Sequence, residues 1–69
     1  MTPYQIELLS QTTDFEMMAG IIYLDLYEEN MEAWELLGDT EIDIHKPLQA
    51  REILEKIAKE IINNDTPRI

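Results

Sequence analysis

Five carboxylates recur along the middle of the chain at alternating intervals of three and four residues: Asp25, Glu28, Glu32, Glu35 and Asp39. If this segment is one continuous α-helix, that spacing places them on a single stripe, about 5 Å apart along the axis. The phosphates of one DNA strand are ~3.4 Å apart in axial projection, with longer separations along the backbone. Such a row would present phosphate-like charge to a protein surface that normally grips DNA.

The charges of the chain are divided unevenly between its two parts. The first 45 residues contain eleven carboxylates and no Lys or Arg, whereas the last 24 hold all five cations and four acids. A helix face that is merely solvated usually interleaves Lys with Glu, because like charges four residues apart destabilise a helix. A solvated face remains the alternative to a functional one. As the partner-binding residues we expect Asp25, Glu28, Glu29, Glu32, Glu35, Asp39, Glu41 and Asp43.

Two other patterns suggest chemistry but are incomplete. Residues 39–43 place oxygens at positions 1, 3 and 5 of a possible EF-hand loop, but position 6 is Ile44 instead of Gly and position 12 is Ala50 instead of Glu. The single histidine, His45, and the single serine, Ser10, lie in different connections, and no third group marks either as activated. We therefore expect no metal site, no cofactor and no catalytic residue, and we expect that the protein is not an enzyme.

The middle of the chain is also apolar. At 100° per residue most of its apolar side chains fall on one helical side, namely Phe15, Ala19, Ile22, Tyr23, Leu26, Ala33, Trp34 and Leu37. A few others lie off that side, so the segment is apolar nearly all round. Such a helix is either central in a bundle or shared with another chain, and association stabilises a chain too short to bury a large core. We expect a homodimer that associates through Ile21, Leu24, Tyr27, Met31 and Trp34.

Local signals predict where the first helices begin and end. Thr2 followed by Pro3 is typical of an N-cap with Pro at the first helical position. Thr13, three residues before Glu16, predicts a capping box and a second helix beginning near Asp14. That helix extends to about residue 30 or, if continuous, to 37; we favour a break, giving helices of about 16 and 7 residues. A strand over residues 22–27 is the alternative, although no partner strand stands beside it.

The last helix is the clearest element and is expected from Pro47 to about Asn63, with a frayed tail from about residue 64. Its apolar positions follow helical spacing closely and are Leu48, Ala50, Ile53, Leu54, Ile57, Ala58, Ile61 and Ile62. Gly38 is expected as the left-handed residue that ends the preceding helix. The fold class predicted is all-α, a small bundle of three or four helices within one domain over residues 1–69, with homodimerisation as a way to complete its core.

Composition limits the cellular compartment and the classes of partner that we expect. The chain has no cysteine, which fits a cytoplasmic protein. The uncharged run from 17 to 24 is far shorter than the ~20 residues that span a bilayer, and no secretory signal is visible at the start. Because the acidic part would be repelled by phosphates and by anionic lipids, we expect neither direct nucleic-acid binding nor membrane binding.

The leading hypothesis is a non-enzymatic inhibitor or modulator that docks its acidic face on a basic, nucleic-acid-binding protein surface. The chain resembles no family closely enough to name. It is similar only in charge and size to the small acidic proteins of viruses and mobile elements, phages included, that imitate DNA. The alternatives are an assembly or adaptor protein that binds a partner helix through its apolar face, and a structural subunit of a larger complex.

Overall fold

The computed structural model describes residues 2–65, and of Asp65 only the backbone. It contains four helices, α1 (Pro3–Gln11), α2 (Phe15–Tyr27), α3 (Met31–Leu37) and α4 (Pro47–Asp65). No strand occurs among the described residues, so the predicted all-α fold is confirmed. The strand alternative for residues 22–27 is wrong, because this stretch lies inside α2 and packs along a helix rather than beside another strand.

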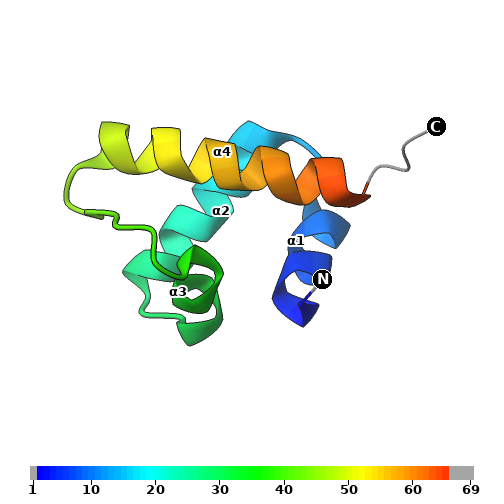
Figure 1. The fold of residues 1–69 in the computed structure, drawn as a ribbon, viewed down its shortest axis with the longest axis horizontal. Coiled ribbons are helices and arrows are strands. Elements are labelled where there is room, and N and C mark those ends of the chain that lie inside the picture. The colour runs from blue at the N-terminus through cyan, green and yellow to red at the C-terminus, as the bar shows by residue number, and fades with distance from the viewer. Residues whose placement is uncertain (1, 66–69) are drawn as a thin grey trace.

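The helices are arranged around the long C-terminal one (Figure 1). Helix α4 crosses α2, and α1 and α3 lie toward opposite ends on the same side of α4 in this view. The most extensive packing is between α2 and α4, while α3 packs on α2 and α1 on α4. The two helices that carry most of the apolar residues therefore form the centre, and α3 projects from it with the loop that follows.

The core is built from the inward sides of all four helices. Its buried members are Tyr4, Leu8, Met18, Ala19, Ile22, Leu26, Ala33, Leu37, Leu54, Ala58 and Ile61. On α4 the predicted face is confirmed for most positions, and Ile53, Ile57 and Ile62 are half-buried. The prediction is wrong for Leu48, which is 82% exposed. Leu48 lies in the first turn, about 120° round the helix from Leu54, and so faces solvent.

Side-chain caps start the first two helices. The Thr2 hydroxyl accepts from the Gln5 N–H at 3.2 Å, and the Gln5 side chain accepts from the Thr2 N–H at 2.9 Å, with Pro3 at the first helical position as predicted. For α2 the predicted Thr13 cap is wrong by one residue. Asp14 is the N-cap, and its carboxylate accepts from the Glu16 N–H at 3.0 Å. Asp caps a helix as well as Thr does, so neighbouring residues compete for this role.

The predicted break in the middle helix is confirmed at Asn30. Its side-chain oxygen accepts from the N–H groups of Glu32 at 2.9 Å and Ala33 at 3.4 Å, which caps α3. Helix α2 ends in a Schellman motif: the Asn30 N–H donates to the Asp25 carbonyl, and the Glu29 N–H donates to the Leu26 carbonyl. The helices have 13 and 7 residues, so α2 is shorter than the 16 expected because this motif takes its last residues.

Helix α3 ends at a glycine that the sequence identified correctly. Gly38 has the predicted positive φ, 56°, but its ψ of −119° lies outside the left-handed helical region. Only a residue without a Cβ adopts this conformation readily. The chain therefore turns away from α3 at this point and runs through residues 38–46 toward the start of α4.

Candidate functional site

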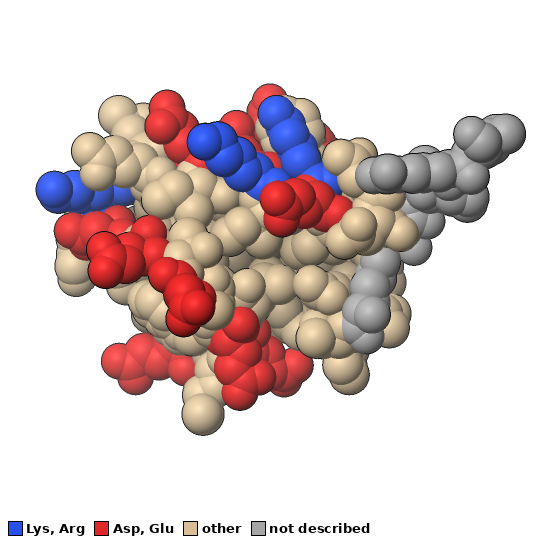
Figure 2. All heavy atoms as spheres, in the orientation of Figure 1, with Lys and Arg blue, Asp and Glu red and all other residues tan. Residues whose placement is uncertain are grey.

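Seven of the predicted partner-binding carboxylates are exposed and lie on α3 and the two connections that flank it. We call this set the acidic end; it consists of Glu28, Glu29, Glu32, Glu35, Asp39, Glu41 and Asp43. Figure 2 shows only acidic charged side chains over α3, whereas the basic side chains lie over α4 and at its N-terminal end, where acidic side chains accompany them. The uneven charge of the sequence thus becomes an uneven charge in space.

The acidic end is a cluster and not a straight row. The stripe from Asp25 to Asp39 required one continuous helix, and α2 and α3 are separate helices with three non-helical residues between them. Charge density is therefore preserved, but the regular spacing suggested by the sequence is lost. Partner binding by these residues stays a prediction.

Asp25, the eighth predicted carboxylate, is half-buried and engaged inside the protein. Its Oδ2 accepts a hydrogen bond from the Tyr4 hydroxyl at 2.5 Å, which joins α1 to α2. Burial raises the pKa of the Tyr4 hydroxyl far above its usual range, and the hydrogen bond to Asp25 raises it further. The charges of Glu7 and Glu32 act in the same direction. Tyr4 is therefore a neutral donor that holds Asp25 in place.

The loop of residues 38–46 carries three members of the acidic end and is fixed at several points. The Tyr23 hydroxyl of α2 donates a hydrogen bond to the Ile44 carbonyl. The Asp43 carboxylate accepts from the His45 N–H at 2.9 Å, and the Asp43 carbonyl accepts from the Lys46 N–H at 3.0 Å. These bonds hold residues 43–46 of the loop in place and fix the position of the Asp43 carboxylate.

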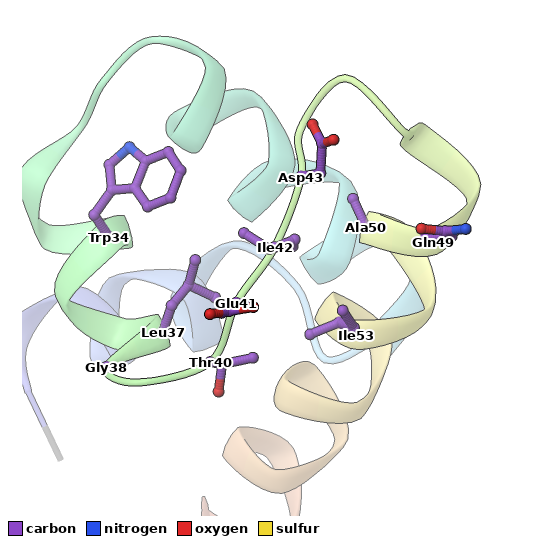
Figure 3. A pocket seen from close by; sticks show the side chains of 10 residues that line it. All are labelled: Trp34, Leu37, Gly38, Thr40, Glu41, Ile42, Asp43, Gln49, Ala50 and Ile53. Carbon is purple, nitrogen blue, oxygen red and sulfur yellow. The ribbon is translucent and has the colours of Figure 1, made fainter.

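A solvent-open hollow of about 600 Å³ lies where this loop passes between α3 and α4. In Figure 3 Trp34 and Leu37 stand on one side, Ala50 and Ile53 on the other, and residues 38–43 run between them. Leu37 and Ala50 are buried, and Ile53 is half-buried. The hollow thus has an apolar floor, and Glu41 and Asp43 of the loop also line it.

A second open hollow, of about 630 Å³, shares Trp34 and Gly38 with the first. It is lined in addition by Met31, Glu35 and Asp39. Trp34 is 39% exposed and so stands between two hollows that each contain two acidic residues. An indole face and nearby carboxylates are the groups that bind a cationic side chain.

The predicted self-association residues are placed on two surfaces. Leu24 and Tyr27 are exposed on α2, together with Met17 and Gly20, at intervals of three, four and three residues. We call Met17, Gly20, Leu24 and Tyr27 the α2 stripe. Met31 and Trp34 line the second hollow on α3. Ile21 is half-buried and packs against the core. Their role in dimerisation stays a prediction.

Three further features of residues 2–65 concern metal binding, the side chains of Ser10 and His45, and membrane spans. Within this range no three His, Asp or Glu side chains come together as a metal site requires. The hydroxyl of Ser10 donates to the Glu7 carbonyl within α1, and His45 is exposed in the loop. None of the helices described is both long and apolar enough to cross a membrane.

Sequence reasoning missed several residues of this site. Tyr23 was expected only in the core, yet its hydroxyl reaches the loop 21 residues further along the chain. Gln49 and Ile53 lie beside the loop of residues 38–46 because α4 folds back past α3. No local sequence pattern predicts this arrangement of the two helices. Trp34 was expected in a dimer interface, which stays a prediction, and it also lines the hollow that holds Glu41 and Asp43.

No known protein family, curated protein or solved structure matches this chain.

Proposed function

We propose that this protein is a non-enzymatic binding module that docks its acidic end on a basic protein surface, of the kind that binds nucleic acid, and blocks it. The single observation that carries this proposal is the gathering of seven exposed carboxylates on α3 and its flanking connections, in a part of the chain without Lys or Arg. A surface of one charge sign attracts partners of the opposite sign and speeds their association. With no cysteine in the chain, we place this activity in the cytoplasm.

The backbone at Glu29 gives independent support. Glu29 has a φ of 62° at the end of α2, a position where Gly is usual and where a residue with a Cβ is strained by about 1 kcal/mol. Strain of this kind tends to occur at functional sites. The chain therefore keeps a carboxylate within the acidic end at a position where Gly would relieve the strain.

Docking of this kind competes with nucleic acid for the same basic residues. Because the acidic end is a cluster, the proposal rests on charge density and not on the spacing of a phosphate row. Binding between exposed charges weakens steeply as the Debye length falls from ~14 Å near 50 mM salt to ~7 Å near 200 mM. A partner held in this way should be displaced by double-stranded DNA, which offers the same charge.

Affinity capture from the native host tests the proposal. The immobilised protein should retain a DNA-binding protein at ~50 mM salt and release it both to ~200 mM salt and to added double-stranded DNA. The matched variant in which Glu28, Glu32 and Glu35 are replaced with Gln should retain much less of it. Capture that survives both DNA and the triple substitution would reject docking through the acidic end.

The α2 stripe favours a second candidate, association through an apolar helix face. The exposed fractions of Met17, Leu24 and Tyr27 are 62%, 62% and 58%. Intervals of three and four residues are those of a helix–helix seam, and Gly20 leaves room for a close approach. A second copy of the chain would cover the α2 stripe if the two copies were oriented with their acidic ends pointing apart.

Sedimentation equilibrium tests this second candidate. At ~100 μM and ~0.15 M salt the wild type should have twice the monomer mass of 8.1 kDa. Leu24→Glu should sediment as the monomer, whereas Leu48→Glu, which changes an even more exposed leucine on α4, should remain a dimer. A wild type that sediments as the monomer would reject self-association and leave docking by the acidic end unaffected.

A further inference from the structure

The two hollows beside Trp34 are lined by apolar and acidic residues, and no described side chain fills them. Their apolar lining comes from Leu37, Ile42, Ala50 and Ile53 on one side of Trp34 and from Met31 on the other. Glu41 and Asp43 belong to the first hollow, and Glu35 and Asp39 to the second. This combination suits a side chain with an apolar stem and a positively charged end.

No described residue supplies a cationic partner to Trp34. Among residues 2–65 the cation–π contact is that of Lys59, whose Nζ lies 4.5 Å from the centre of the Phe15 ring. No described Lys or Arg lies over the indole, and no described group accepts a hydrogen bond from its N–H. Because no Lys or Arg occurs before residue 46 and none of the described ones lies over the indole, this place is open to a cation from another molecule.

We propose that the hollows beside Trp34 bind an arginine side chain of the basic partner, with the guanidinium stacked on the indole and paired with the neighbouring carboxylates. This inference rests on the proposed docking function, and it names the type of partner residue that the acidic end binds. Charge complementarity selects a cation, and the indole selects Arg over Lys. A guanidinium is planar, stacks on aromatic faces and binds carboxylates through two parallel hydrogen bonds.

The hollows beside Trp34 are preorganised by the fold of the loop. Gly38, at the junction of the two hollows, turns the chain so that residues 39–43 pass between α3 and α4. The Tyr23 hydroxyl fastens the far part of the same loop through the Ile44 carbonyl. The loop that carries Glu41 and Asp43 is therefore held along the first hollow before any ligand arrives, which lowers the entropy cost of binding.

The single tryptophan makes the test direct, because all indole fluorescence comes from Trp34. The probes are two synthetic peptides of equal length and charge, one alternating Gly with Arg and the other Gly with Lys. At ~20 mM salt the Arg peptide should change the Trp34 emission and bind about threefold to fivefold more tightly than the Lys peptide. Trp34→Leu should remove this preference, as measured by calorimetry, and Trp34→Phe should retain part of it.

Tyr27→Leu is the matched control, since Tyr27 is an exposed aromatic outside both hollows, and it should leave the preference for Arg unchanged. Equal affinity for the two peptides, or unchanged Trp34 emission when the Arg peptide saturates the wild type, would overturn the inference without any variant. If binding in that case is still lost in the Glu28, Glu32 and Glu35 triple variant, the proposed function stands and only the arginine site fails. If neither peptide binds the wild type, both proposals fail.

Discussion

The hydroxyl of Tyr23 donates a hydrogen bond to the backbone carbonyl of Ile44, which joins the centre of α2 to the loop between α3 and α4. The ring of Tyr23 also lies 6.3 Å from that of Tyr27, measured between centroids, so two aromatic side chains share this side of α2. The loop carries Asp39, Glu41 and Asp43. One hydrogen bond thus couples the packed core to the position of three carboxylates of the acidic end.

Tyr23→Phe should lower the free energy of unfolding by about 1 kcal/mol, since the Ile44 carbonyl loses its donor. Amide exchange should accelerate in residues 39–46 more than in α4, because the loop loses its attachment. Tyr27→Phe is the control, since its hydroxyl is exposed and makes no hydrogen bond within the described residues. Equal effects of the two substitutions on loop exchange would contradict the role given to Tyr23.

Two leucines of α4 provide a matched test of the core. Leu54 is fully buried between the helices, whereas Leu48 is 82% exposed on the same helix. Leu54→Ala should lower the free energy of unfolding by about 2–5 kcal/mol, because it leaves a cavity, and Leu48→Ala by no more than about 0.5 kcal/mol. Chemical denaturation measures both values. Similar losses at the two positions would contradict the packing of α4.

Substitution of Glu29 tests whether its backbone stores strain. Glu29→Gly should raise the free energy of unfolding by about 0.5–1 kcal/mol relative to Glu29→Gln, because Gly adopts a φ of 62° without a Cβ clash. Both variants lose the same charge, so their difference isolates the backbone. If Glu29→Gln proved the more stable in thermal and chemical denaturation, the argument from strain would be withdrawn.

The raised pKa of Tyr4 predicts an alkaline effect on stability. Burial and the Asp25 carboxylate favour the neutral hydroxyl in the folded state, whereas in the unfolded chain it ionises near pH 10. The contribution of the Tyr4 hydroxyl to the free energy of unfolding is therefore fully present below pH 10 and declines as the pH rises further. Tyr4→Phe should be less stable than the wild type at pH 8, by about 1 kcal/mol. This gap should narrow above pH 10, and a gap that stays constant would contradict the shift.

Local chemistry made much of the fold predictable. Thr2 with Pro3, Asn30 and Gly38 act through their own side chains and dihedral preferences, so their positions determine where helices begin and end. The prediction of Thr13 as N-cap was wrong because Asp14, one residue later, caps the helix in its place. The prediction for Leu48 was wrong because this residue lies about 120° round the helix from Leu54, outside the face that packs on the core.

The candidate site was predictable in composition but not in shape. The carboxylates of the acidic end follow from the sequence because they are close together in it and no cation interrupts them. The hollow beside Trp34 depends on contacts among α3, the loop and α4, and the bond from Tyr23 to Ile44 links residues 21 apart. Such contacts are set by tertiary packing, which leaves no periodic signal in the sequence.

The measurement that tests the central claim most directly compares two triple variants for their association rate with the DNA-binding protein captured by the wild type. One replaces Glu28, Glu32 and Glu35 with Gln at the acidic end. The other replaces Glu7, Glu52 and Glu60, which are equally exposed elsewhere. Each removes three negative charges, so net charge is matched and only location differs.

At ~50 mM salt the account predicts that the acidic-end variant associates at least tenfold more slowly than the wild type, with a weaker dependence on salt. The second variant should associate within about threefold of the wild type, because its substitutions lie away from the docking surface. Equal slowing in both variants would mean that only the total charge matters. An unchanged rate in the acidic-end variant would contradict the claim that this surface binds the partner.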